Sequence, residues 1–285
     1  MSTLAHGREA YAERRWPDAV GQYTAADHDA ELPASDLEQL ATAVILTGRG
    51  SEGVDILARA HLKYLADGDY PAAARCAVWT GLSLILLGEP ARSAGWLARA
   101  HQIVEDLPEP CRFEGLLSVP VGLGALYQGD GATAAEAFTR AADLGRARGD
   151  ADSAALGTLG LGQTKVMLGE FDDGLALLDE AMVAVTVGEI SPIPAGVLYC
   201  AVIETCHLAF DLHRAHEWTR ALDRWCDGQQ SLVFFSGQCQ MHRAELYRLH
   251  GAWTEAMDAA KTAQDFAFRG DRMAIYGGFY EQGEI

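Results

Sequence analysis

The sequence predicts an all-α protein built from consecutive helical hairpins that repeat about every forty residues. A small residue, a turn residue seven positions later and a small–large–small triplet recur along nearly the whole chain. Apolar residues recur at helical intervals, as at Ala137, Ala141 and Leu144. No segment shows the alternation of apolar and polar residues that marks a β-strand. These observations favour a helical repeat over a mixed fold.

Three copies of the pattern are clear, and each joins two expected helices. They are Gly122, Gly129, Ala134, Phe138 and Ala141; Gly162, Gly169, Gly174, Leu178 and Ala181; and Ala244, Gly251, Ala256, Ala260 and Ala263. Weaker copies complete the chain at Gly7, Trp16, Ala19, Tyr23 and Ala26; Ala41, Gly48, Gly53, Leu57 and Ala60; Gly81, Gly88, Ser93, Leu97 and Ala100; and Ala209, Trp218, Ala221, Trp225 and Gly228. Residues 1–285 therefore form one expected domain of seven hairpins, followed by the start of an eighth.

The spacing has a steric cause. Small residues let the two helices of a hairpin approach closely, while a large side chain fills the space between neighbouring hairpins. Glycine adopts the positive φ that ends the first helix. We therefore expect antiparallel pairs turning near Gly48, Gly88, Gly129, Gly169 and Gly251, with Phe138 and Trp225 buried between hairpins.

This pattern resembles the tetratricopeptide repeat, which implies a right-handed solenoid. The period is longer than the standard of about 34 residues, with 41 residues from Gly81 to Gly122, 40 from Gly122 to Gly162 and 47 from Gly162 to Ala209. An ordinary helical bundle with coincidental spacing is the alternative.

The long period, together with residues 225–228, 237–246 and 250–256, resembles the sensor solenoids of LuxR-type and MalT-like bacterial transcriptional regulators, especially actinobacterial members. That resemblance implies a sensing domain in transcription regulation. Two features of such regulators are missing: there is no phosphate-binding G-x-x-x-x-G-K-[ST] loop, and no helix-turn-helix follows the repeats. The expected chain is therefore a truncated sensor module.

The charge and composition limit the possible partners. The formal net charge is −18 and 49% of the residues are hydrophobic, so the chain has a core and repels phosphate backbones. We expect no direct nucleic-acid binding, no membrane insertion and, in the absence of a signal sequence or paired cysteines, a cytoplasmic location. No cofactor is expected.

Catalysis and metal binding have little support. Cysteines and histidines cluster between residues 200 and 250, but their spacings match no zinc motif, and buried cysteine with surface histidine is the simpler interpretation. No nucleophile motif is present either. We expect no catalytic residue and no metal site, with a divergent enzyme using this cluster as the second alternative.

The expected binding surface is the concave groove lined by the first helix of each hairpin, which is the groove position in the tetratricopeptide family. A carboxylate clamp of the chaperone type is improbable because the chain lacks asparagine. An apolar trough would suit a hydrophobic small molecule, whereas a protein scaffold would bind a peptide or helix there. Alternatively, the same helices are simply buried. The expected groove residues are Leu82, Ile85, Leu123, Leu126, Tyr127, Gln163, Met167 and Phe210, with His213 and Arg248 at the polar end.

The predicted function is accordingly a ligand- or partner-sensing domain of a transcriptional regulator without catalysis of its own. A scaffold for protein–protein interaction, binding a peptide or helix in the groove, is the first alternative. The sequence predicts neither the ligand nor the oligomeric state.

Overall fold

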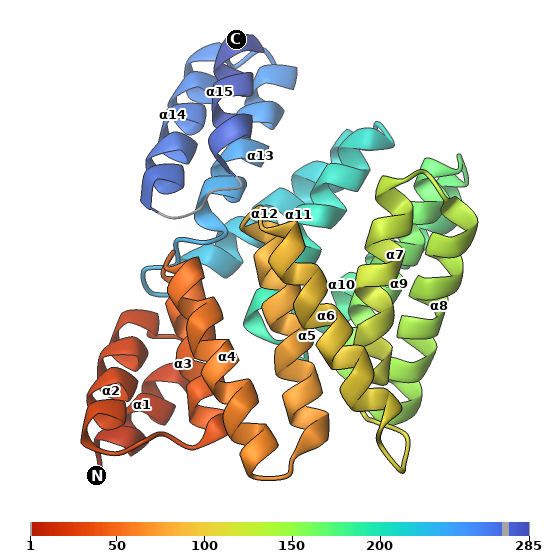
Figure 1. Ribbon diagram of the computed structural model, residues 1–285. Coiled ribbons are helices and arrows are strands. Elements are labelled where there is room, and N and C mark those ends of the chain that lie inside the picture. The colour runs from red at the N-terminus through yellow and green to blue at the C-terminus, as the bar shows by residue number, and fades with distance from the viewer. Residues whose placement is uncertain (1, 270–273, 285) are drawn as a thin grey trace. The chain divides into compact units, whose positions relative to one another are not determined.

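The computed structural model describes residues 2–269 and 274–284, and every regular element in them is helical. Consecutive helices pair as antiparallel hairpins (Figure 1). Within the described residues the only β-type contact is an isolated bridge between Arg15 and Gln230. The predicted all-α fold of repeated hairpins is confirmed. In the same part of the chain, no helix is both long and apolar enough to cross a membrane.

The chain divides into two compact units, and the second contains most of the middle repeats. Unit 2 comprises residues 64–82 and 90–215. Its helices are most of α5 (Tyr70–Leu86), then α6 (Pro90–Glu105), α7 (Glu114–Tyr127), α8 (Gly131–Arg148), α9 (Ala151–Met167), α10 (Phe171–Thr186) and α11 (Pro192–Leu208). In this unit α9 packs against α7, α8, α10 and α11.

Unit 1 is discontinuous in sequence and comprises residues 1–63, 83–89 and 216–285. Its helices are α1 (Thr3–Ala12), α2 (Trp16–Asp29), α3 (Ala34–Leu46), α4 (Gly50–Ala66), most of α12 (Leu212–Asp227), α13 (Ser236–Leu249), α14 (Trp253–Arg269) and α15 (Ala274–Glu284). The last helix packs against both α13 and α14, as the first helix of a further hairpin would.

The small and large residues of the repeat pack against each other as the sequence predicts. Phe138 on α8 is 1% exposed, and its ring lies over glycines of both neighbouring first helices, Gly122 on α7 and Gly160 on α9. A Cβ atom at Gly122 would lie 2.7 Å from that ring. Gly7 faces Tyr23 and Gly162 faces Leu178 in the same manner. The predicted burial of Phe138 between hairpins is confirmed.

The turns between paired helices share one hydrogen-bonding pattern. Gly129 N donates to Leu126 O at 3.0 Å and Asp130 N donates to Ala125 O at 2.9 Å. This is the Schellman arrangement, in which the residue after the helix has a positive φ. All five predicted turn glycines (Gly48, Gly88, Gly129, Gly169 and Gly251) have φ between 74° and 88°.

The sixth hairpin departs from its predicted register. Ala209 is the C-cap residue of α11, and the turn that follows is made by Phe210. The buried triplet of α12 is Ala215, Thr219 and Leu222, not the predicted Trp218, Ala221 and Trp225. The prediction was wrong here because a phenylalanine stands where most of the other hairpin turns have glycine. Trp225 is consequently only half-buried, with its ring edge-on to Phe235 at 5.9 Å.

One connector in unit 1 joins residues far apart in the sequence. Residues 229–235, between α12 and α13, bury Leu232, Val233, Phe234 and Phe235. Val233 N donates to Leu46 O at the end of α3 at 2.9 Å. The buried indole Nε1 of Trp16 donates to Gln229 Oε1 at 3.2 Å. Repeat arrays usually contact only their neighbours, but here the first hairpins contact the segment before the seventh.

Candidate functional site

The predicted groove residues fall in both compact units. Ile85 and Arg248 belong to unit 1, whereas the others belong to unit 2. In unit 2, the first helices bury most of the side chains that a groove would expose: Leu116, Val119, Leu156, Leu159, Ile203 and Cys206. These helices form the core of the hairpin array along most of their length.

Leu123 and Leu126 also serve packing. Both are half-buried and lie against the core cluster that contains Ala125, Ala134 and Phe138. Leu82 is half-buried too. Gln163 is half-buried and donates from Nε2 to Thr205 Oγ1 on α11 at 3.3 Å, so it links two first helices.

The two residues of the proposed polar end, His213 and Arg248, belong to different units. Arg248 donates from Nε to Glu281 on α15 at 2.9 Å, and the Glu281 side chain is only 7% exposed. Burial raises the pKa of the Glu281 carboxyl, and the ion pair with Arg248 opposes that rise. His213 is exposed on α12. Arg248 therefore holds α15 against α13. The sequence pattern could not distinguish this structural role from a role in ligand binding.

The remaining apolar residues are exposed, and they share one place in the repeat. Tyr127, Met167 and Leu208 each end a first helix of unit 2, namely α7, α9 and α11. Because alternate helices of a hairpin array run in the same direction, these ends lie along one edge. We define the apolar turn edge as the exposed side chains of Tyr127, Met167, Leu168, Phe171, Leu208 and Phe210.

Phe210 is the unusual member of the apolar turn edge. Its side chain is 88% exposed and its φ is 58°, in the left-handed region that favours glycine. Phe210 N donates to His207 O at 3.0 Å and Asp211 N donates to Cys206 O at 2.9 Å, as at Gly129 and Gly169. A bulky residue there costs on the order of 1–3 kcal/mol. The packing described above gives no reason for this phenylalanine, because its side chain lies in solvent.

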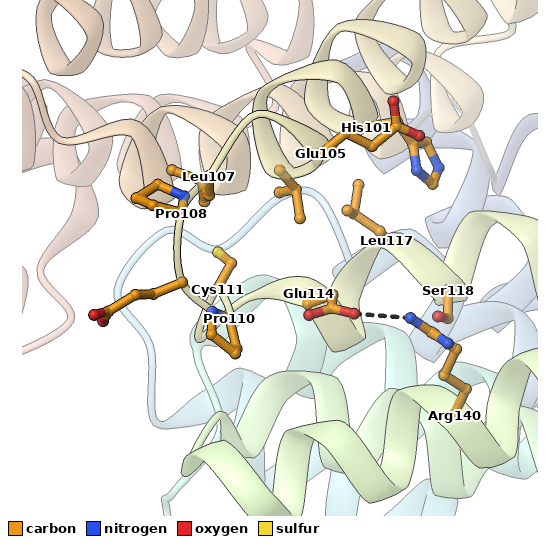
Figure 2. A pocket seen from close by; sticks show the side chains of 12 residues that line it. His101, Glu105, Leu107, Pro108, Pro110, Cys111, Glu114, Leu117, Ser118 and Arg140 are labelled. Atoms are coloured by element: carbon orange, nitrogen blue, oxygen red, sulfur yellow. Dashed lines mark hydrogen bonds and ion pairs between the residues drawn. The ribbon is translucent and has the colours of Figure 1, made fainter.

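A second feature of unit 2 is a hollow of about 480 Å³ between α6 and α7 (Figure 2). We call it the α6–α7 hollow. Its lining comes from the end of α6 (His101, Val104, Glu105), the connector (Leu107, Pro108, Glu109, Pro110, Cys111), the start of α7 (Glu114, Leu117, Ser118) and Arg140 of α8. Sequence reasoning missed it, although the connector of residues 106–113 contains two prolines and is as long as the connector between α12 and α13.

One wall of the α6–α7 hollow is fixed by ion pairs. Glu114 accepts from Arg140 at 2.7 Å, as the dashed line in Figure 2 shows, and from Arg148 at 2.5 Å. Arg148 also donates to the carbonyl oxygen of Cys111. Burial raises the pKa of the Cys111 thiol, which keeps it protonated and unreactive. This wall is therefore structural, and its two arginines outnumber its one carboxylate.

Two buried cysteines of the cysteine and histidine cluster, Cys206 and Cys239, have raised thiol pKa values. Burial raises the pKa of Cys206 to about 12. A hydrogen bond with Cys226, together with burial, raises the pKa of Cys239, which also donates to Asp223 Oδ1 at 2.8 Å. These are thiols rather than nucleophilic thiolates. In residues 2–269 and 274–284, no three His, Cys, Asp or Glu side chains converge in a way that could hold a metal ion.

No protein-family model and no curated protein sequence matches the chain. Solved structures do. A Rap protein in complex with competence and sporulation factor aligns at 14% identity over 94% of this chain and 74% of that one, with a TM-score of 0.64. The Rap conjugation gene regulator of a plasmid, in complex with a peptide, aligns at 13% identity over 94% and 75%, with a TM-score of 0.60.

A third similar structure is a signal-transduction ATPase from Pyrococcus horikoshii that carries a tetratricopeptide repeat sensor. It aligns at 13% identity over 94% of this chain and 44% of that chain, with a TM-score of 0.51. The fold is a tetratricopeptide-like array of helical hairpins. Identities this low establish the fold alone.

Proposed function

We propose that this chain is a recognition domain that binds a peptide or protein segment along the apolar turn edge of unit 2. Phe210 carries the proposal. Its backbone conformation favours glycine, and its ring is exposed to water. Strain of this kind at an exposed aromatic residue is typical of a binding position.

The neighbouring repeats support the same surface. Tyr127 is 87% exposed at the equivalent end of α7, and Met167 and Leu168 are exposed at the end of α9. Aromatic residues and methionine are enriched at interfaces because they bury a large apolar area on contact. Two solved structures with a similar fold, both Rap proteins, are complexes with competence and sporulation factor and with the Phr* peptide.

We further propose that this binding serves a sensing role, as the resemblance of residues 225–228, 237–246 and 250–256 to LuxR-type regulators implies. The similar fold of an ATPase with a tetratricopeptide repeat sensor agrees with that role. A sensor requires a partner with different affinities for two states of the domain.

Selection from a displayed library of random peptides against the purified chain tests the proposal. We expect saturable binding of apolar peptides, measured by fluorescence anisotropy. Two variants, Tyr127→Ser and Phe210→Gly, each remove one aromatic side chain from the interface. Each should weaken peptide binding by about tenfold or more, because a buried aromatic side chain contributes roughly 1.5–3 kcal/mol.

The matched control is Val187→Ser. Val187 is a 63% exposed apolar side chain of unit 2 that follows α10, at the opposite end of the hairpins. It should leave peptide binding unchanged. The proposal is refuted when no peptide saturates the folded chain, or when Val187→Ser weakens binding as much as Phe210→Gly does.

A further inference from the structure

The apolar turn edge carries an excess of negative charge around its exposed apolar side chains. Its three turns, residues 127–130, 165–173 and 207–214, hold five carboxylates but only two lysine or arginine side chains. The carboxylates are Asp130, Glu170, Asp172, Asp173 and Asp211, and the cations are Lys165 and Arg214. The residues next to the apolar side chains are therefore mostly acidic.

The first of the two cations, Lys165, is shared between two carboxylates of its own turn. Its Nζ lies 2.5 Å from Glu170 Oε2 and 3.2 Å from Asp173 Oδ2. The hydrogen bond with Glu170, and then that with Asp173, raises the pKa of Lys165. The lysine is therefore held within the turn, and one of its two carboxylates remains in surplus.

The second cation, Arg214 at the start of α12, is shared in the same way. Its guanidinium lies 2.5 Å from Asp211 in its own turn and 3.1 Å from Asp179 of α10. The contact with Asp179 joins α12 to α10, so the turn that holds Phe210 is tied to the preceding hairpin. Neither cation of the edge is thus available to an acidic partner.

Two further carboxylates of the edge have no cation beside them. Asp130 is the exposed N-cap residue of α8, and its Oδ1 accepts a hydrogen bond from Thr133 N at 3.1 Å. Hydrogen bonds with Thr133 lower the pKa of Asp130, so this carboxyl is charged at neutral pH. Asp172 is exposed in the first turn of α10. Within residues 2–269 and 274–284, neither of these two aspartates forms an ion pair.

The acidic and apolar groups of adjacent turns lie together. A Cβ atom at Gly131, the residue after Asp130, would lie 3.0 Å from Cδ2 of Leu168. The turn between α7 and α8 therefore touches the turn between α9 and α10. Leu168 is next to Asp130 through this contact, and it precedes Glu170 by two residues. The carboxylates thus border the exposed apolar side chains.

The distance along the edge sets the length of a partner that covers it. Helix α9 packs against both α7 and α11. Packed helices lie about 8–10 Å apart, so Tyr127 at the end of α7 and Phe210 after α11 are separated by at most about 16–20 Å of edge. An extended chain advances about 3.3 Å per residue. A segment of about six residues therefore spans the three turns.

Building on the binding proposed above, we propose that the partner of the apolar turn edge is a basic segment of about six residues or more that carries both apolar side chains and lysine or arginine. Its apolar side chains would cover Tyr127 and Phe210, and its cations would reach Asp130 and Asp172. The methylene stem of a lysine or arginine also covers apolar surface while its charged head stays in water. The same carboxylates would repel an acidic segment, a nucleic acid or an anionic membrane.

Fluorescence anisotropy with three peptides that differ only in charge tests the inference on the full chain. The peptides FKLFKL, FSLFSL and FELFEL, with capped ends and one common labelled linker, share their apolar residues. At about 0.1 M salt we expect FKLFKL to bind about tenfold tighter than FSLFSL, because two exposed ion pairs contribute up to about fivefold each. FELFEL should bind most weakly. At about 1 M salt the preference should largely disappear, since the screening length falls from about 10 Å to about 3 Å.

A double variant, Asp130→Asn with Asp172→Asn, then locates the charge. It should reduce the preference for FKLFKL over FSLFSL by about threefold or more, because it removes the two carboxylates that have no cation beside them. Asparagine caps a helix about as well as aspartate, so α8 keeps its N-cap. The matched control is Asp106→Asn with Glu189→Gln. Both residues are exposed and follow second helices, α6 and α10, at the opposite end of the hairpins. Circular dichroism melts establish that each variant is folded.

Three results would overturn this inference and leave the apolar turn edge as a binding surface. They are saturable binding of FSLFSL with no tighter binding of FKLFKL, a preference that does not change with salt, or an equal loss of preference in the control variant and in the Asp130/Asp172 variant. The salt dependence is measured on the wild-type chain and so requires no variant to fold. Failure of all three peptides to saturate the folded chain would overturn this inference together with the proposed function.

Discussion

The contact between Phe138 and Gly122 predicts a measurable energetic coupling between neighbouring helices. Phe138→Ala removes a side chain that is 1% exposed and packs against two glycines. Truncating a buried phenylalanine costs about 3–5 kcal/mol of unfolding free energy. Gly122→Ala places a Cβ atom 2.7 Å from the Phe138 ring, too close for an ordinary contact. Overpacking of this kind costs about 1–3 kcal/mol.

The double variant should be less destabilised than the sum of the two single variants. Once the ring is absent, the methyl group added at position 122 has space, and alanine is a better helix former than glycine by up to about 1 kcal/mol. We therefore expect a coupling energy of about 1–3 kcal/mol from urea unfolding followed by circular dichroism. Gly124→Ala in the same helix is the control, because a Cβ atom there meets nothing within 4 Å. That variant should be neutral or slightly stabilised. Additivity within about 0.5 kcal/mol would refute the packing argument.

Three further predictions use other parts of the chain. Phe210→Gly should leave the unfolding free energy unchanged or raise it by up to about 1 kcal/mol, because it relieves a positive φ of 58° at an 88% exposed residue; a clear loss in thermal denaturation would contradict the strain. Arg248→Ala should destabilise the chain by roughly 1–3 kcal/mol at neutral pH, since it leaves the Glu281 carboxylate buried and unpaired. Burial already raises the pKa of Glu281, so the folded chain binds a proton at this carboxyl more readily than the unfolded chain does. Part of the lost unfolding free energy should therefore return as the pH falls toward the ordinary glutamate pKa of 4.5. A loss that does not depend on pH would contradict this reasoning. Trp16→Phe removes the hydrogen bond to Gln229 and should increase hydrogen exchange in residues 229–235; unchanged exchange there would show that the contact does not hold the connector.

The fold was predictable because its determinants are local. Small residues, turn glycines and large side chains at fixed spacing gave six of the seven hairpins in the correct register. The sixth was misplaced because its turn position holds Phe210 instead of glycine. In addition, Ile203 stands where the clearest repeats have a small residue, and Thr219 stands where they have a large one. With the register corrected, Ile203 follows Gly162 by 41 residues, close to the spacing of its neighbours.

The candidate site was less predictable because periodicity does not separate a buried helix face from an exposed one. The same apolar spacing includes Leu123, which packs beside Phe138, and Tyr127, which is exposed. The α6–α7 hollow has no repeat signature at all, since it arises from the length and proline content of one connector. The pairing of Arg248 with Glu281 could not be predicted either, because the two residues are 33 positions apart and lie on different helices.

The hydrogen bond between Trp16 and Gln229 also bears on how the chain folds during synthesis. The two residues are separated by 213 positions. At about 5–20 residues per second, a ribosome needs roughly 10–40 s after making Trp16 before Gln229 exists. During that interval α1 to α3 lack the connector that covers the end of α3, while the middle repeats of unit 2 already have their neighbours. Unit 1, although it contains the first residues made, is therefore the last to be completed on the ribosome.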